Sequence, residues 1–158
     1  MWPFDRLRRA KTRVLAVASG GGHWVQLLRI MPAFEDCQII FATVSRAYRS
    51  QVPARRFYTV HDATRWNKLG LLRMGLKLAW IILIERPDVI ISTGAAPGYF
   101  AIRLGKLIRA RTIWVDSIAN VEQLSLSGKR IGSHADLWLT QWPHLASPAG
   151  PYYAGAVL

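Results

Sequence analysis

Short apolar runs alternate with longer amphipathic segments along the whole chain. The short runs are rich in Val, Ile and Leu, which favours β-strands, and the longer segments have the length of helices. Strands are predicted at residues 14–18, 38–44, 57–60, 89–91, 112–117 and 137–141. Helices are predicted at residues 24–34, 67–85 and 98–109, and the second of these ends before Pro87.

This alternation is typical of right-handed βαβ units that form a parallel sheet covered by helices on both faces. We therefore expect an α/β fold, a Rossmann-like three-layer domain over residues 14–158, preceded by a basic segment over residues 1–13. The chain has no internal repeat and no linker long enough to indicate a second domain. Residues 120–134 are the least regular part and are expected to form a loop over the site.

The composition is strongly basic. The chain has 158 residues, 51% of them hydrophobic, which is enough for one buried core. Its formal net charge of +12 implies an anionic partner, which could be a nucleic acid, a phosphorylated ligand or an acidic lipid surface. Cys37 is the single cysteine, so a disulfide or a paired-cysteine metal site within the chain is excluded, and the histidines lack ligand spacing. We expect no metal and a reducing cytosolic environment.

The N-terminal sequence MWPFDRLRRAKTR is basic but does not resemble a secretory signal, so we expect it to stay on the mature protein. Elsewhere the longest uninterrupted apolar stretch, residues 78–84, is far shorter than the roughly 20 residues that span a bilayer. The chain is therefore not expected to cross a membrane by itself.

Three polar breaks each follow an apolar strand directly: residues 19–23 (SGGGH), 92–94 (STG) and 116–117 (DS). The carboxyl ends of parallel strands share one edge of a sheet, and such sheets bind ligands at that edge. We expect the three breaks to converge there and to form one site.

The first break places three glycines, Gly20, Gly21 and Gly22, before a helix. Backbone N–H groups and the helix dipole favour a phosphate or diphosphate at such a turn. The alternative is a tight strand-to-helix connection without a ligand. A nicotinamide dinucleotide is less favoured, because the loop lacks Gly-x-Gly-x-x-Gly and the second strand ends at Ser45 and Arg46 without an acidic residue.

Three ionisable side chains are candidates for acid–base chemistry. His23 lies at a first helical turn, where the helix dipole disfavours imidazolium and leaves a neutral ring that can exchange a proton. Asp116 is expected as an exposed carboxylate at the ligand edge, and Glu122 follows it closely. The structural alternatives are a capping His23, a turn-forming Asp116 and an ordinary exposed Glu122.

The helix at residues 67–85 is unusually apolar, yet Arg73 and Lys77 lie one turn apart, near Trp66 and Trp80. With the basic residues of the N-terminal segment it is predicted to contact an anionic membrane. The basic residues of that segment are Arg6, Arg8, Arg9, Lys11 and Arg13. The alternative is a helix buried between the sheet and a partner. Nucleic acid is disfavoured because the chain has no recognition-helix, RNA-binding or metal-finger motif.

The order of motifs SGGGH, PDVIISTG, VDSIANVEQLSLSGK, ADLWLTQWP and YYAGAV resembles one family along nearly the whole chain. This is the family of the acceptor-side subunit of the eukaryotic dolichol-linked N-acetylglucosaminyltransferase, with its bacterial exopolysaccharide and capsule relatives. The SLSGK and QWP stretches are the specific part. The first glycine loop also looks like that of the murein glycosyltransferase that makes lipid II.

The resemblance implies the N-terminal, acceptor half of a split GT-B glycosyltransferase. This half would bind the membrane and a lipid-diphosphate-linked saccharide, while a partner subunit in the heterodimer holds the UDP-sugar. The family's site would include Ser19, Gly20, Gly21, Gly22 and His23 in the first loop, Thr93 and Gly94 in the second, and Asp116, Ser117, Asn120 and Glu122 in the third. Eukaryotic members more often carry glutamate first in the third loop. A bacterial, peripheral protein on the cytoplasmic face of the inner membrane is expected.

The expected reaction is inverting transfer without a metal, with His23 or Asp116 removing the proton of the acceptor hydroxyl. Two other functions stay open at this point. One is a membrane recruitment and activation module without catalytic residues, and the other is a nucleotide-dependent oxidoreductase.

Overall fold

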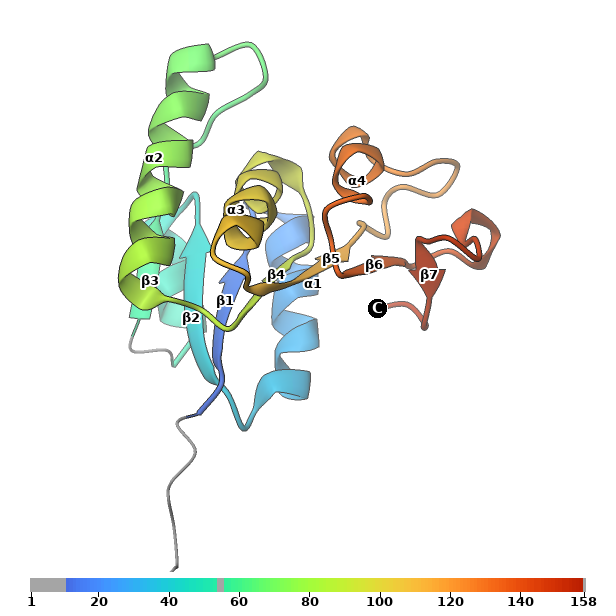
Figure 1. Ribbon diagram of the computed structural model, residues 1–158, viewed down its shortest axis with the longest axis horizontal. Coiled ribbons are helices and arrows are strands. Elements are labelled where there is room, and N and C mark those ends of the chain that lie inside the picture. The colour runs from blue at the N-terminus through green and yellow to red at the C-terminus, as the bar shows by residue number, and fades with distance from the viewer. Residues whose placement is uncertain (1–10, 54–55, 158) are drawn as a thin grey trace, which may run out of the picture.

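The chain forms one seven-stranded sheet in which all the neighbouring strands are parallel (Figure 1). The computed structural model describes residues 11–53 and 56–157. The strand order is β3-β2-β1-β4-β5-β6-β7. The strands are β1 Arg13–Val17, β2 Gln38–Thr43, β3 Arg56–Thr59, β4 Val89–Ser92, β5 Arg111–Val115, β6 Leu137–Thr140 and β7 Tyr152–Tyr153. The order reverses between β1 and β4, which is the switch point at which such sheets bind ligands.

Helices cover both faces of the sheet, as predicted (Figure 1). The α-helices are α1 Gly22–Ile30, α2 Lys68–Glu85, α3 Ala95–Leu107 and α4 Leu126–Ile131. Three short 3₁₀ helices are η1 Met31–Phe34, η2 Arg46–Gln51 and η3 Pro143–Leu145. Helix α1 packs on one face, and α2, α3 and α4 pack on the other.

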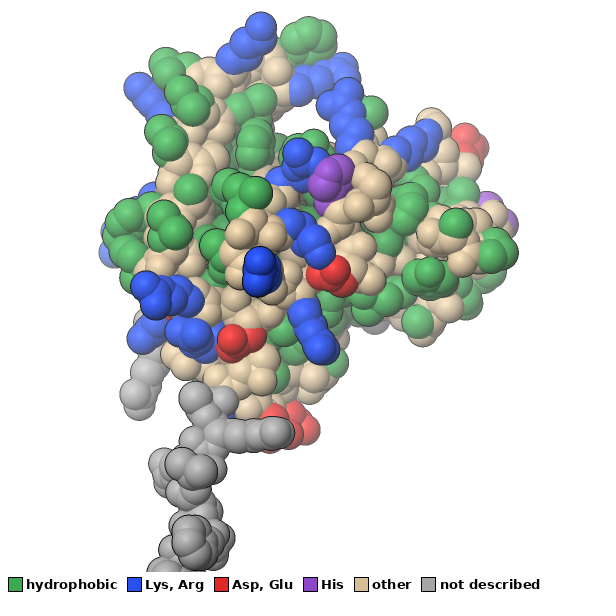
Figure 2. Space-filling view, viewed as in Figure 1, with side chains coloured by type: hydrophobic (Ala, Val, Ile, Leu, Met, Phe, Trp, Pro, Cys, Tyr) green, Lys and Arg blue, Asp and Glu red, His purple; other side chains and the backbone are tan. Residues whose placement is uncertain are grey.

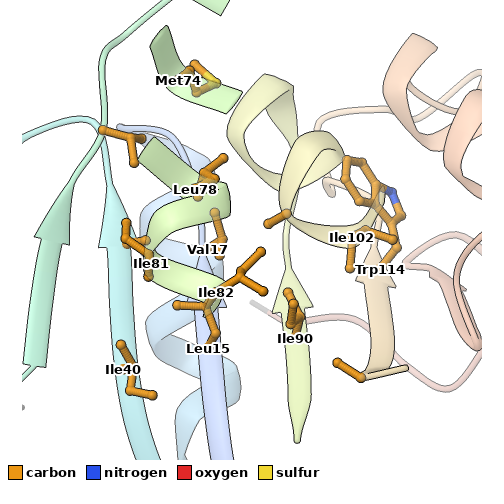
Figure 3. Packing of buried hydrophobic residues seen from close by; sticks show 14 of the residues in the cluster. Leu15, Val17, Ile40, Met74, Leu78, Ile81, Ile82, Ile90, Ile102 and Trp114 are labelled. Carbon is orange, nitrogen blue, oxygen red and sulfur yellow. The ribbon is translucent and has the colours of Figure 1, made fainter. Parts of the chain in front are cut away.

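The core follows from the alternation of side chains along the central strand. In β1, Leu15 and Val17 point to the face covered by α2 and α3, whereas Val14 and Ala16 point to the face covered by α1. Figure 3 shows Leu78 of α2 beside Val17 and Ile82 of α2 beside Leu15, with Ile90 on β4 and Ile102 next to Trp114 in the same cluster. Burial on both faces explains why the central strands are apolar throughout instead of alternating with polar residues.

Three elements differ from the sequence prediction. Residues 120–134 were expected as a loop, but they contain α4, which Ser125 caps by accepting a hydrogen bond from the N–H of Gly128 at 2.8 Å. Strand β7 was not predicted, because two residues carry no periodic pattern. Helix α3 begins before the predicted start since Pro97 lies in the first turn, where no intrahelical N–H bond is lost.

The predicted membrane residues divide into two groups. Arg6, Arg8 and Arg9 lie outside the described residues. Trp66, Arg73, Lys77 and Trp80 lie in or next to α2 and are exposed. In the described part of the chain, no helix has both the length and the apolar character needed to cross a bilayer.

A buried carboxylate fixes the end of α2 against the edge of the sheet. Glu85 is 2% exposed and accepts hydrogen bonds from the guanidinium of Arg56 and the hydroxyl of Tyr58 on β3. The hydrogen bond to Glu85, burial and the charge of Glu85 raise the pKa of Tyr58 above its ordinary value of 10.0. The carboxylate is therefore paired, as a buried charge requires.

Tyr58→Phe removes one donor from this carboxylate and is expected to lower the free energy of unfolding by about 1–3 kcal/mol. Urea denaturation at pH 7 measures the loss, with the exposed Tyr152→Phe as the matched control. Because the folded pKa of Tyr58 is raised, its contribution is complete below pH 10.0 and is lost as the pH rises through the folded pKa. The stability gap to the variant should therefore shrink in alkali; a gap absent at pH 7 contradicts this role of the hydroxyl.

Candidate functional site

The first and second polar breaks touch each other at the switch point. The ring nitrogen Nδ1 of His23, in the first turn of α1, lies 2.9 Å from the carbonyl oxygen of Thr93. The hydroxyl of Thr93 in turn donates to the carbonyl oxygen of His23 at 2.6 Å. These reciprocal bonds join the loop after β1 to the loop after β4.

The Thr93 carbonyl also selects the protonation pattern of the imidazole. A carbonyl oxygen can only accept, so Nδ1 of His23 must carry the hydrogen of this bond. In the neutral ring, Nε2 then holds the lone pair. A histidine whose Nδ1–H is held by an acceptor is oriented for proton abstraction through Nε2.

Gly94 makes room for the ring. Its φ of 137° lies in a region that favours glycine, and a β-carbon at this position would lie 2.5 Å from Cε1 and Nδ1 of His23. The imidazole therefore packs directly on the backbone of Gly94. Ala95 follows with a φ of 64°, a conformation that side-chain-bearing residues seldom adopt.

A buried glutamine joins the third break to the first. Gln26, one turn after His23 on α1, donates from Nε2 to the Ser117 hydroxyl at 3.1 Å. Its Oε1 accepts from the Ile118 N–H at 3.1 Å and from Nε2 of Gln141 at 2.6 Å. All three polar breaks therefore meet at the carboxyl edge of the sheet, and the predicted convergence is confirmed.

The expectation of an exposed Asp116 was wrong. Asp116 is 1% exposed, and its two oxygens accept four hydrogen bonds. The Trp114 indole N–H donates to Oδ1 at 3.2 Å and the Asn120 amide donates to Oδ2 at 3.3 Å. The Ser125 hydroxyl and N–H donate at 2.5 and 2.8 Å. In the structure the carboxylate holds the loop 117–125 and the start of α4.

The glycine loop leaves backbone donors at the surface. Gly21 has a φ of 62°, and its N–H donates to the hydroxyl of Tyr48 at 2.9 Å. Gly21 and Gly22 are exposed. Helices α1 and α3 have no side-chain cap, whereas Asn67 caps α2 and Ser125 caps α4. The first-turn N–H groups of the two helices that begin at the switch point therefore have no side-chain cap, and in α3 the third position, Pro97, has no N–H.

The remaining predicted site residues have different environments. Thr93 and Ser117 are buried, so their side chains lie beneath the surface of the loops that follow β4 and β5. Ser19 and Asn120 are half-buried, and the Asn120 side chain is directed at Asp116. Glu122 is exposed in the loop after Asp116. Within residues 11–53 and 56–157, no three His, Cys, Asp or Glu side chains form a group that could hold a metal ion.

Four residues of this edge were missed by sequence reasoning: Gln26, Tyr48, Ser125 and Gln141. Gln26 gave the clearest signal, since a polar residue three positions after His23 falls on the inner face of α1. Ser125 stands in the SLSGK stretch that the motif comparison singled out. Gln141 is the first residue of the QWP stretch, which was singled out in the same way, whereas Tyr48 reaches the site through the tertiary fold and nothing near it in sequence indicates it.

Helix α2 exposes a continuous apolar stripe on the side away from the sheet. It consists of Leu69, Leu72, Leu76, Trp80 and Leu83, spaced by three or four residues. Arg73 and Lys77 flank it, and the Lys77 ammonium lies 4.2 Å from the ring centroid of Trp80. Figure 2 shows hydrophobic side chains, in green, with Lys and Arg side chains, in blue, among them along α2 at the left of the molecule.

Comparison with known proteins places the chain in a family. The model of the family described as "Oligosaccharide biosynthesis protein Alg14 like" matches residues 55–157, which is more than half of the chain. The chain belongs to the Alg14 family.

Curated Alg14 relatives are named as subunits of UDP-N-acetylglucosamine transferase. The Schizosaccharomyces pombe subunit is 41% identical over 68 residues, which cover 39% of this chain and 31% of that protein. The human subunit is 27% identical over 175 residues, covering 89% of this chain and 80% of that protein. In the S. pombe and Yarrowia lipolytica proteins, the match spans only about a third of the length, 31% and 36%. These relatives are eukaryotic, so the bacterial exopolysaccharide branch stays a prediction.

Solved structures confirm the Rossmann-like fold of this Alg14 family member. MurG of Acinetobacter baumannii superimposes with a TM-score of 0.73 at 12% identity, covering 92% of this chain and 45% of MurG. UDP-N-acetylglucosamine 2-epimerase of Rickettsia bellii gives a TM-score of 0.69 at 13% identity, with coverage of 92% and 45%. The chain therefore spans slightly less than half the length of these proteins.

The Asp116 contacts generate a test of its structural role. In Asp116→Asn, one terminal atom becomes an NH₂ group that faces N–H and O–H donors instead of accepting from them. Hydrogen bonds to a charged group contribute roughly 1.5–3 kcal/mol each, so we expect a loss of at least about 1.5–3 kcal/mol of unfolding free energy. Thermal denaturation and hydrogen exchange at the Ser125 amide measure it. Glu122→Gln, at an exposed position, should change stability by less than about 0.5 kcal/mol; equal effects would refute the structural role.

Proposed function

We propose that the chain is the acceptor-binding, membrane-associated subunit of a two-component inverting glycosyltransferase. A partner subunit holds the UDP-sugar, and the acceptor is a saccharide linked to a lipid diphosphate. The family membership, the relatives named as transferase subunits and the match to 45% of MurG support a split enzyme. The observation that carries the proposal is the His23 imidazole, held at the switch point by the Thr93 carbonyl with Nε2 as its basic atom.

In this mechanism Nε2 of His23 accepts the proton of the acceptor hydroxyl as its oxygen attacks the anomeric carbon of the donor. The bond from that carbon to the UDP oxygen breaks, and UDP leaves with the bonding electron pair. The uncapped N-termini of α1 and α3 stabilise the anionic part of the acceptor. Asp116 acts through the loop it holds, as a positioning residue. Because charge is stabilised by backbone donors and by the partner, the mechanism requires no metal.

Membrane contact is the second part of the proposal. The stripe on α2 exposes large apolar side chains to water; Leu76, for example, is 63% exposed. A contiguous exposed apolar surface of this kind marks a contact with a membrane or another protein. Flanking cations would attract anionic headgroups, and the apolar side chains would enter the interfacial layer. The arrangement supports peripheral contact with a membrane surface, which keeps a lipid-linked acceptor next to the site; the cytoplasmic face is part of the proposal.

The role of His23 is tested in the reconstituted pair. His23→Gln keeps a donor for the Thr93 carbonyl but has no basic nitrogen, so we expect kcat to fall by about 10²–10⁴-fold with little change in KM. His61→Gln, an exposed histidine after β3, is the control. Full turnover of His23→Gln would support a recruitment module without catalytic residues.

The membrane surface is tested by vesicle flotation. Leu72→Glu with Leu76→Glu should abolish binding to vesicles that contain anionic lipid, because carboxylates replace the centre of the stripe and repel the headgroups. Arg73→Gln with Lys77→Gln should weaken binding about tenfold or more at low salt, at roughly 1 kcal/mol per charge, and less at high salt. Binding that survives both double substitutions would show that α2 does not contact the membrane.

A further inference from the structure

A groove of ≈ 230 Å³ opens between α2, α3 and α4, beside the N-terminus of α3. Its lining is amphipathic. Arg65 before α2 and Arg130 on α4 supply two guanidinium groups, and both residues are exposed. The surface between them is apolar and aromatic, formed by Leu71, Tyr99, Phe100 and Leu126. Figure 2 shows Lys and Arg side chains around the upper part of this face, between α2 and α4.

The groove adjoins the reaction centre. Ala96, in the first turn of α3, lines it, and Gly94, two residues earlier, carries the imidazole of His23 on its backbone. The uncapped start of α3 therefore stands between the groove and His23. A ligand in the groove can direct one end to the catalytic edge without crossing the sheet.

The other end of the groove leads to the apolar surface of α2. Leu71 lines the groove, and its neighbour Leu72 is 58% exposed in the stripe. Leu126 on the opposite wall is also 51% exposed. The groove and the stripe therefore lie on adjoining sides of α2, which brings an apolar chain that leaves the groove close to the surface assigned to the membrane.

The side chains that line the groove determine which kind of ligand fits it. Guanidinium groups bind phosphate oxygens in a fork geometry, and two of them with a helix N-terminus match a dianionic or trianionic diphosphate. Phe100 and Leu126 have no group that binds a phosphate and instead fit hydrocarbon, as does the ring of Tyr99. The volume is below the about 300–1,000 Å³ of sites that enclose a whole ligand, which suits a headgroup whose chain continues along the surface.

We propose that this groove binds the diphosphate and the first isoprene units of a prenyl diphosphate, with Arg65 and Arg130 as the diphosphate clamp. The inference rests on the proposed function and makes it more specific. It assigns the diphosphate to the switch point next to Ala96 and adds two guanidinium groups to the helix N-termini named above.

The test is calorimetric titration of the full chain with farnesyl diphosphate, inorganic pyrophosphate and farnesol, each below its aggregation concentration. We expect farnesyl diphosphate to bind at least tenfold more tightly than either of the other two. Arg65→Gln and Arg130→Gln should each weaken its binding about tenfold or more, while Arg29→Gln, an exposed arginine on α1, should leave it unchanged. Leu126→Ser should weaken farnesyl diphosphate but not pyrophosphate.

Equal affinity for pyrophosphate and farnesyl diphosphate would contradict the claim that the groove binds the isoprene units. Unchanged binding in both arginine variants would contradict the claim that Arg65 and Arg130 bind the diphosphate. Arg65 lies with its guanidinium 4.7 Å from the ring centroid of Trp66, so near-ultraviolet circular dichroism of Arg65→Gln confirms that the loop keeps its fold. The assay involves no sugar transfer. The two proposals can fail separately. If the reconstituted pair binds farnesyl diphosphate but transfers no sugar, the proposed function is contradicted and the assignment of the groove is not.

Discussion

The contact between His23 and the backbone of Thr93 and Gly94 is the interaction on which the site depends. It joins two helix N-termini across the point where strand order reverses, and it fixes which ring nitrogen holds the lone pair. A side chain at position 94 would occupy the place of the ring, 2.5 Å from its atoms. The glycine therefore serves the packing of the imidazole as well as the turn itself.

Much of the fold could be predicted from the sequence, because each buried strand is a compact apolar run that ends at a polar turn. The convergence of the three loops followed from the same pattern, since parallel strands share a carboxyl edge. Elements held by distant contacts could not be predicted. Helix α4 depends on the Ser125 cap and on Asp116, nine residues earlier, and β7 exists because Tyr152 pairs with Leu139.

The convergence of the three loops was predicted, but the environment of their side chains was predicted only in part. The sequence around an acidic residue that follows a strand does not indicate whether its side chain faces solvent. Asp116 lies beneath a loop and accepts four hydrogen bonds. The network of Gln26 and Gln141 joins residues 115 positions apart, so no local pattern indicates it. What distinguishes these cases is burial, and burial of a polar side chain is decided by the tertiary fold.

The central claim, that the Thr93 carbonyl holds His23 with Nε2 as the basic atom, is tested most directly by nitrogen-15 NMR of the imidazole in the intact chain. Long-range couplings from the ring protons distinguish a protonated ring nitrogen from one that carries a lone pair. The structure predicts that, in the neutral ring of His23, Nδ1 carries the hydrogen and Nε2 does not. A neutral His23 with its hydrogen on Nε2, or a ring that exchanges freely between the two forms, would contradict it.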